Sequence, residues 1–257
     1  MSLCRHPHIT TFYTSFISGK DVWLVTPIYE AGSVANLLKL KFPTGITQQP
    51  ILIFILKCVL DALKYLHKQG QIHRNVKASN ILLDLKGKVY LSDFGVSAIL
   101  REKPLAKTFT GTPCWMAPEI LIEEQGYNYK ADIWSLGITA IELAEGTAPY
   151  SELTSMKIIK TIISADPPRL KEESKWDEKF VAFVYDCLQK NPALRPSVPE
   201  LLEKYADLFE KACDESQVEV LMVEIPYLED RVVYSIQYRY LLHSWMKQRS
   251  IRRRRRL

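Results

Sequence analysis

The sequence is poor in the features that mark membrane, secreted and metal-binding proteins. No apolar run of about eighteen residues occurs, and the richest stretch, Ile51 to Leu56, ends at Lys57, so no segment is expected to span a bilayer. The opening residues, MSLCRHPHIT, contain no apolar signal core. The five cysteines are scattered, odd in number and without a Cys-x-x-Cys pair. This pattern favours reduced thiols, and therefore the cytoplasm or nucleus, over a disulfide framework.

The body of the chain also lacks a net positive charge. The net charge is +5, but Arg249 and Arg252 to Arg256 supply six of the positive charges. Without them, 28 basic residues face 29 acidic ones. A body that binds nucleic acid needs a basic face, so this class is not favoured. The tail at 249–257 is expected to be a solvated end, with contact to anionic surfaces or the nuclear import machinery as the alternatives.

Hydrophobic periodicity predicts short strands followed by many helices, which indicates an α+β fold with a helical majority. A hairpin is expected from the runs Ile9 to Phe16 and Val22 to Thr26. The stretch from residue 96 to Pro118 has no regular hydrophobic periodicity, which is typical of a functional or disordered loop. Residues 218–223 fit a strand or a helix, and residues 232–247 fit an amphipathic helix. The ranges predicted to be helical are 34–41, 47–69, 130–145, 155–163, 178–189 and 198–209.

Three short motifs follow one another in the middle of the chain. His73-Arg74-Asn75, with Asn80 five residues after Asn75, is followed by Asp93-Phe94-Gly95 and then by Ala117-Pro118-Glu119. In this order and spacing, over residues 1 to about 210, the chain resembles a eukaryotic protein kinase. The stretches 91–100, 111–120 and 126–150 are similar to the sterile-20-related germinal-centre kinases, in particular to the oxidative-stress-responsive and SPAK-like Ser/Thr kinases.

The resemblance implies a protein-kinase-like fold with four parts. Residues 1–30 would be a remnant of the small lobe with the hinge, and residues 31–210 the large lobe. Residues 211–248 would be a C-terminal extension, followed by the basic tail at 249–257.

The same resemblance implies Mg-ATP as the ligand. Asp93 and Asn80 would hold Mg²⁺, since a hard cation prefers oxygen ligands. Lys77 would neutralise charge on the transferred phosphate. Thr26, at the gatekeeper position, and Ile28, in the hinge, would lie beside the nucleotide.

Further positions carry regulatory and structural expectations. Arg74 would receive a phosphate on the activation loop, for which Thr108 is the best candidate, with an ordinary loop hydroxyl as the equal alternative. Thr112 would shape the substrate-binding end of that loop. The structural residues implied are Glu119, which pairs with Arg195, and Asp132, which braces the catalytic loop.

Two departures from the family pattern weaken the expectation of catalysis. Asn75 stands where the family has the aspartate that accepts the substrate proton, and loss of a general base removes a factor of about 10² to 10⁴ in rate. No Gly-x-Gly-x-x-Gly occurs, and the first glycine is Gly19, already in the hairpin turn. The strand lysine and helix glutamate that precede this hairpin in the family are likewise not found, so Mg-ATP binding is expected to be weak.

These observations favour a truncated, catalytically impaired pseudokinase that acts as a binding or scaffolding component of kinase signalling, with protein partners or substrates. The alternative is an active ATP-dependent protein serine/threonine kinase, represented here by an N-terminally incomplete chain. A decayed copy without function is the third interpretation.

Overall fold

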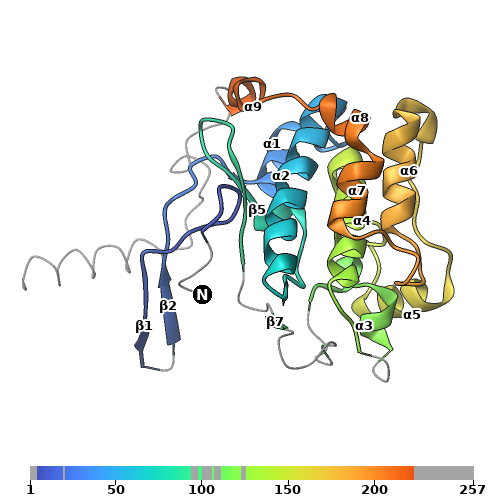
Figure 1. The fold of residues 1–257 in the computed structure, drawn as a ribbon, viewed down its shortest axis with the longest axis horizontal. Helices are drawn as coiled ribbons and strands as arrows, with labels where there is room; N and C mark the ends of the chain where they lie inside the picture. Colours follow the sequence, from blue (N-terminus) through green and yellow to red (C-terminus); the bar gives the residue numbers. More distant parts are fainter. Residues whose placement is uncertain are drawn as a thin grey trace, which may run out of the picture. The chain divides into compact units, whose positions relative to one another are not determined.

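A computed structural model describes residues 5–19, 21–93, 98–99, 106, 111–122 and 126–222 (Figure 1). Its strands are β1 (Thr14–Ser18), β2 (Asp21–Val25), β3 (Gly32–Ser33), β4 (Gln71–Ile72), β5 (Ile81–Leu83), β6 (Val89–Leu91) and β7 (Ala98–Ile99). Its helices are α1 (Val34–Lys41), α2 (Gln49–Lys68), α3 (Pro118–Leu121), α4 (Lys130–Glu145), α5 (Ser155–Ser164), α6 (Glu178–Cys187), α7 (Val198–Lys204), α8 (Ala206–Glu210) and α9 (Glu215–Met222). Small antiparallel sheets beside a helical majority confirm the predicted α+β class. No helix among these residues combines the length and apolarity that a membrane span needs.

The predicted hairpin is present, but its first strand is shorter than expected. Strands β1 and β2 pair antiparallel with Ser18 opposite Asp21, and β1 begins at Thr14. The sequence prediction was wrong for Ile9, which instead forms a parallel bridge with Leu91 of β6. Ile9 is 1% exposed, so its side chain belongs to the hydrophobic core of the helical body. Strand β6 also pairs with β5, and β5 with β3.

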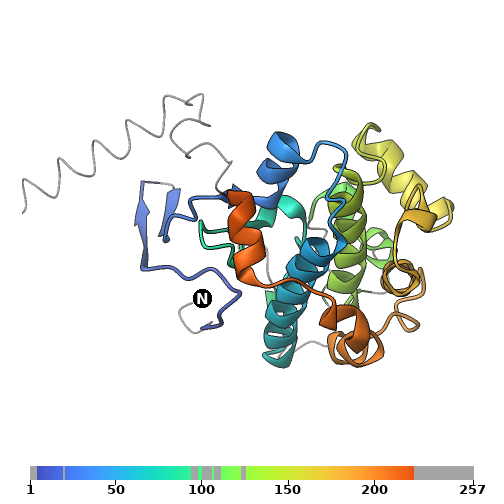
Figure 2. The ribbon, with the colours of Figure 1, turned by 90° about the horizontal axis from the view of Figure 1, so that it is seen from above.

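Helix α4 forms the centre of the body, with α2 and α6 packed beside it (Figures 1 and 2). Every residue from Ala131 to Ala144 is buried, as expected for a helix that is covered on all sides. The helix ends at Gly146, whose left-handed φ of 81° suits a residue without a side chain. Its neighbours contribute large buried side chains, among them Phe180 and Phe183 of α6.

The last predicted helix, 198–209, is divided in the structure. Ser197 and Glu200 form a capping box at the start of α7. The helix ends at Tyr205, where α8 begins in a new direction. The Tyr205 hydroxyl donates a hydrogen bond to Asp186 of α6 at 2.7 Å. The apolar periodicity of residues 198–209 did not predict this break between α7 and α8, at which Tyr205 makes its tertiary contact.

Helix α9 packs on the turn between β5 and β6 (Figure 2). Gly87 in this turn has φ +78°, and a Cβ atom there would lie 2.3 Å from the backbone oxygen of Glu215. Val218 of α9 is fully buried against the body. Only glycine allows this close approach between helix and turn. Helix α9 covers most of the segment 218–223, for which the sequence allowed either a strand or a helix. Residues 223–257, including the predicted helix at 232–247 and the tail Arg252 to Arg256, lie outside the described residues.

Candidate active site

The catalytic loop predicted from the His73-Arg74-Asn75 motif lies between β4 and β5 and is held by Asp132 of α4. One carboxylate oxygen of Asp132 accepts the backbone N–H of Arg74 at 2.8 Å. The other accepts the backbone N–H of His73 at 2.9 Å and Nε2 of His67 at 2.8 Å. Arg74 has a left-handed φ of 69°, a strained backbone for an arginine. Asp132 is therefore hydrogen-bonded to the loop that it was predicted to brace.

Four side chains of the site are joined head to tail by hydrogen bonds. Lys77 Nζ donates to Thr112 Oγ1 at 2.7 Å. The Thr112 hydroxyl donates to Asn75 Oδ1 at 3.2 Å, and Asn75 Nδ2 donates to Asp93 Oδ2 at 3.0 Å. The structure thus brings together three of the predicted site residues, Asn75, Lys77 and Asp93, and adds Thr112, which the sequence had placed among the regulatory positions.

The residues expected to hold magnesium suit that ion. Asn80 Nδ2 donates to the backbone oxygen of Asn75 at 2.8 Å and, at 3.4 Å, to Asp93 Oδ2. Asn80 can therefore offer its own carbonyl oxygen to a ligand. The Asp93 side chain is exposed, and its left-handed φ is 67°. Mg²⁺ in phosphate-transfer sites takes one or two side-chain oxygens and completes its shell from phosphates and water. Asp93 and Asn80 would hold it, and the ion would supply positive charge for phosphate oxygens.

The remaining nucleotide and regulatory positions are Thr26, Ile28, Arg74 and Thr108. Thr26 and Ile28 lie between β2 and β3 with exposed side chains, and Ile28 is 69% exposed. The Arg74 guanidinium donates to the hydroxyl of Tyr127 at 3.3 Å. Thr108, the predicted phosphate acceptor, lies outside the described residues. These roles stay predictions.

The structural pair expected from the sequence is a buried ion pair. Arg195 contacts both carboxylate oxygens of Glu119 at 2.6 Å, and the two side chains are 0% and 8% exposed. The pair joins the end of the activation segment to the loop between α6 and α7. Its structural role stays a prediction.

Glu142, a residue that the sequence analysis missed, lies beneath the site. Its Oε2 accepts the backbone N–H of Ala78 at 2.9 Å and Trp115 Nε1 at 3.0 Å. Burial raises the pKa of Glu142 from 4.5 to about 7, although both hydrogen bonds and the charge of Lys77 act in the opposite direction. The available signal was an acidic residue within the otherwise apolar stretch 140–144.

We expect Glu142→Gln to be more stable than the wild-type chain at high pH and not at low pH. Because the pKa of Glu142 is higher in the folded than in the unfolded chain, its contribution is full below pH 4.5 and is lost as pH rises through about 7. Glutamine is neutral at every pH and keeps an acceptor oxygen. Urea unfolding at about pH 5 and about pH 8 should show a relative gain of roughly 2–3 kcal/mol at the higher pH. Equal differences at both pH values would contradict this expectation.

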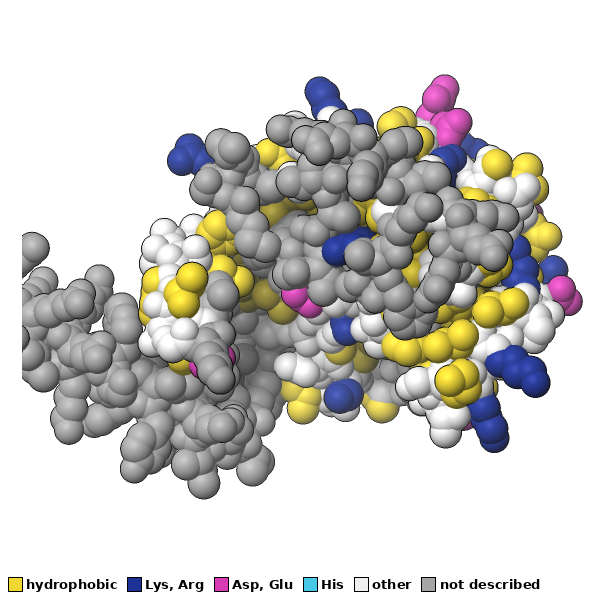
Figure 3. Space-filling model, turned by 90° about the horizontal axis from the view of Figure 1, so that it is seen from below, with side chains coloured by type: hydrophobic (Ala, Val, Ile, Leu, Met, Phe, Trp, Pro, Cys, Tyr) yellow, Lys and Arg dark blue, Asp and Glu magenta, His cyan; other side chains and the backbone are white. Residues whose placement is uncertain are grey.

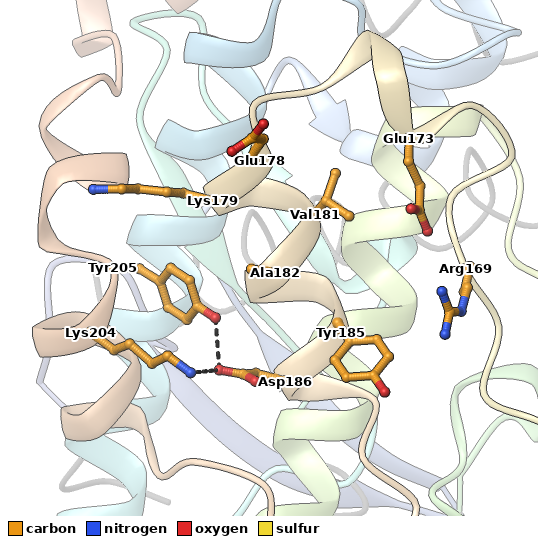
Figure 4. A pocket seen from close by; sticks show the side chains of 10 residues that line it. All are labelled: Arg169, Glu173, Glu178, Lys179, Val181, Ala182, Tyr185, Asp186, Lys204 and Tyr205. Atoms are coloured by element: carbon orange, nitrogen blue, oxygen red, sulfur yellow. Dashed lines mark hydrogen bonds and ion pairs between the residues drawn. The ribbon is translucent and has the colours of Figure 1, made fainter.

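A groove of about 460 Å³ lies between α6 and α7 (Figure 4). Its lining includes no residue of the catalytic loop. Asp186 in its wall accepts Lys204 Nζ at 2.6 Å and the Tyr205 hydroxyl at 2.7 Å. Arg169 lies over the ring of Tyr185, 5.3 Å from its centroid. The charge of Asp186 is thus already paired with that of Lys204, and Arg169 packs against an aromatic ring. On the face shown in Figure 3, basic side chains of the described residues are scattered singly among hydrophobic ones.

The protein kinase domain model matches residues 1–205 of the chain. The chain is 45% identical over 207 residues to the serine/threonine-protein kinase fray2 of Dictyostelium discoideum, with 79% of this chain and 20% of that protein covered. It is 41% identical over 247 residues to germinal center kinase 3 of Caenorhabditis elegans, with 87% and 41% covered. It is 45% identical over 212 residues to the serine/threonine-protein kinase ppk11 of Schizosaccharomyces pombe, with 82% and 66% covered.

The chain thus spans between 20% and 66% of the length of these relatives. The family predicted from the three motifs is confirmed by the domain match, and the Ser/Thr and germinal-centre character by the relatives. The chain belongs to the protein kinase family and is similar to its serine/threonine kinases, germinal center kinase 3 among them.

Proposed function

We propose that this chain is a kinase-fold protein that binds protein partners in kinase signalling and transfers phosphate weakly or not at all. One observation carries the proposal: position 75, where the family has a carboxylate, holds an amide whose two polar atoms are both engaged. Asn75 Nδ2 donates to Asp93, and Oδ1 accepts from Thr112. An amide has no basic atom that could take a proton from a substrate hydroxyl.

The size of the expected deficit follows from the chemistry. Removing a general base costs a factor of about 10² to 10⁴, whereas positioning and charge stabilisation supply most of phosphoryl transfer. The chain retains Lys77, Asn80 and Asp93, the residue types that the family uses for those tasks. This retained group favours the second candidate function, an active serine/threonine kinase that uses Mg-ATP and acts on protein substrates.

The proposal also includes weak nucleotide binding and a location in the cytoplasm or nucleus. The location is supported by the thiols of Cys58, Cys114, Cys187 and Cys213, all of which are free. The basic tail is proposed as a contact for anionic surfaces or import factors.

Transfer of labelled phosphate from Mg-ATP to a mixed Ser/Thr peptide substrate separates the two candidate functions. We expect the wild-type chain to transfer phosphate no faster, or only slightly faster, than the Asp93→Ala variant, whose metal site is removed. A wild-type rate clearly above that of Asp93→Ala would establish the active kinase instead. Thermal shift with millimolar Mg-ATP reports binding separately, because a bound ligand raises the melting temperature. A large shift that Asp93→Ala abolishes would contradict weak binding.

A further inference from the structure

The hydrogen-bond chain of the site runs from a cation to an anion. Lys77 at one end is an ammonium group that only donates, and Asp93 at the other end is a carboxylate that only accepts. Between them, the Thr112 hydroxyl accepts from Lys77 and donates to Asn75, which in turn donates to Asp93. Each link therefore has one donor and one acceptor. Along these contacts, no donor faces a donor and no acceptor faces an acceptor.

This pattern determines which way the Asn75 amide points. In the opposite orientation, Oδ1 would face the Asp93 carboxylate, and two acceptors would oppose each other. The NH₂ group would then face Thr112, whose hydroxyl proton would lose the acceptor that Asn75 Oδ1 provides at 3.2 Å. Asn75 is also 9% exposed, so water has little access to replace a lost partner. The whole chain of hydrogen bonds therefore fixes the amide orientation in which Asn75 Nδ2 contacts Asp93.

A carboxylate at position 75 would change the electrostatics of the same geometry. An oxygen would replace Nδ2 at about the same place, 3.0 Å from Asp93 Oδ2. Two carboxylates this close repel each other unless a proton or a cation lies between them. We propose that the Asn75 amide takes the place of that cation, so that the catalytic loop and Asp93 keep their geometry without a divalent metal ion. The inference rests on the proposed function in one respect, namely that position 75 is the carboxylate position of the family.

Asparagine at position 75 also changes how strongly the site attracts a cation. With asparagine at position 75, the charges of Lys77 and Asp93 balance. A cation held by Asp93 and Asn80 would therefore face one carboxylate fewer than in a site with aspartate at 75. A divalent ion alone is therefore expected to stabilise the wild-type chain little and the Asn75→Asp variant more.

The test measures the melting temperature of the full chain at about pH 8 without nucleotide or peptide, in EDTA and with MgCl₂ alone. We expect the wild type to melt at the same temperature in both. Asn75→Asp should melt about 2–4 °C lower in EDTA and recover with millimolar MgCl₂. KCl at equal ionic strength is the control for screening and should not restore stability. Asn75→Ala removes the amide without adding a charge and should not respond to magnesium.

The double variant Asn75→Asp with Asp93→Asn exchanges carboxylate and amide and keeps the test decisive even if Asn75→Asp does not fold in EDTA. It restores a contact between one donor and one acceptor at positions 75 and 93. We therefore expect its melting temperature to be independent of magnesium. The proposal is overturned if Asn75→Asp is as stable as wild type in EDTA. It is also overturned if the wild type gains as much from MgCl₂ as Asn75→Asp does, or if the exchanged variant needs magnesium. None of these readouts measures phosphate transfer, so an active wild-type kinase would overturn the proposed function and leave this result standing.

Discussion

Replacing Arg195 with leucine is expected to lower the free energy of unfolding by about 3–5 kcal/mol, the usual cost of breaking a buried ion pair from one side. All five N–H groups of the guanidinium have partners. Besides the two contacts with Glu119, Nε donates to the Gln189 carbonyl at 2.6 Å. The remaining donors contact the carbonyl oxygens of Lys130 at 2.9 Å and Lys190 at 3.2 Å. Leucine would leave the Glu119 carboxylate buried without a counter-charge.

Two further variants show how much of this loss depends on geometry. Arg195→Lys keeps the charge, but its three donors radiate from one nitrogen atom and cannot reproduce the planar fork. We therefore expect it to recover only a minor part of the stability. The matched control is Lys175→Ala, which breaks an ion pair with Glu172 whose side chains are 64% and 63% exposed. That change should cost less than about 1 kcal/mol.

Urea unfolding followed by circular dichroism measures these differences, since a change in midpoint at constant slope reports stability. An Arg195→Leu midpoint close to that of Lys175→Ala would show that the buried pair contributes little. In that case the anchoring of the activation segment would depend on the apolar packing around Ala117 and Ile120, which are 0% and 5% exposed.

Several helices of the body were predictable because their ends carry a local signal. Ser33 caps α1 by accepting the N–H of Asn36, and Gly146 ends α4. In both cases the residue type alone indicates the boundary. The position of Ile9 was not predictable, because an alternating apolar run does not specify which strand it will join. Its partner, Leu91, is 82 positions away. Burial of the Ile9 side chain in the helical body favours this partner over a place in the hairpin.

The site was predictable to a similar extent. The order of the three motifs predicted that Asn75, Lys77, Asn80 and Asp93 share a site, because the family spacing encodes the fold around them. Hydrogen bonds join Asp93 to Asn75 and to Asn80, whereas the catalytic and metal-binding roles stay predictions. The direction of the Asn75 amide was not encoded in that spacing. It depends on the hydroxyl of Thr112, which lies 37 positions along the chain. Glu142 and His67 were missed for the same reason, since their importance comes from partners that only the folded chain supplies.

Asp132→Ala should also cost about 3–5 kcal/mol of unfolding free energy. Asp132 is fully buried, and alanine would leave three donors without their acceptor, two of them backbone N–H groups. Burial by itself would raise the pKa of Asp132, but the hydrogen bond from His67 and the nearby charges of His67 and His73 outweigh it and hold the pKa below its ordinary value of 3.8. The stabilisation by the ionised carboxylate is therefore present above pH 3.8 and is lost as pH falls through the lower pKa of the folded chain.

The same substitution should change the catalytic loop, which distinguishes it from a simple loss of packing. The strained backbone of Arg74, with φ 69°, is held in part by the hydrogen bond from its N–H to Asp132. Without that acceptor we expect the amides of His73, Arg74 and Asn75 to exchange with solvent much faster at a pH where the fold persists. Asp207→Ala is the matched control: it also removes an aspartate from an ion pair, but that side chain is 70% exposed. It should cost less than about 1 kcal/mol and leave these amides unchanged. Equal protection of the loop in wild type and Asp132→Ala would mean that the chain of contacts from Lys77 to Asp93, rather than Asp132, holds the catalytic loop in place.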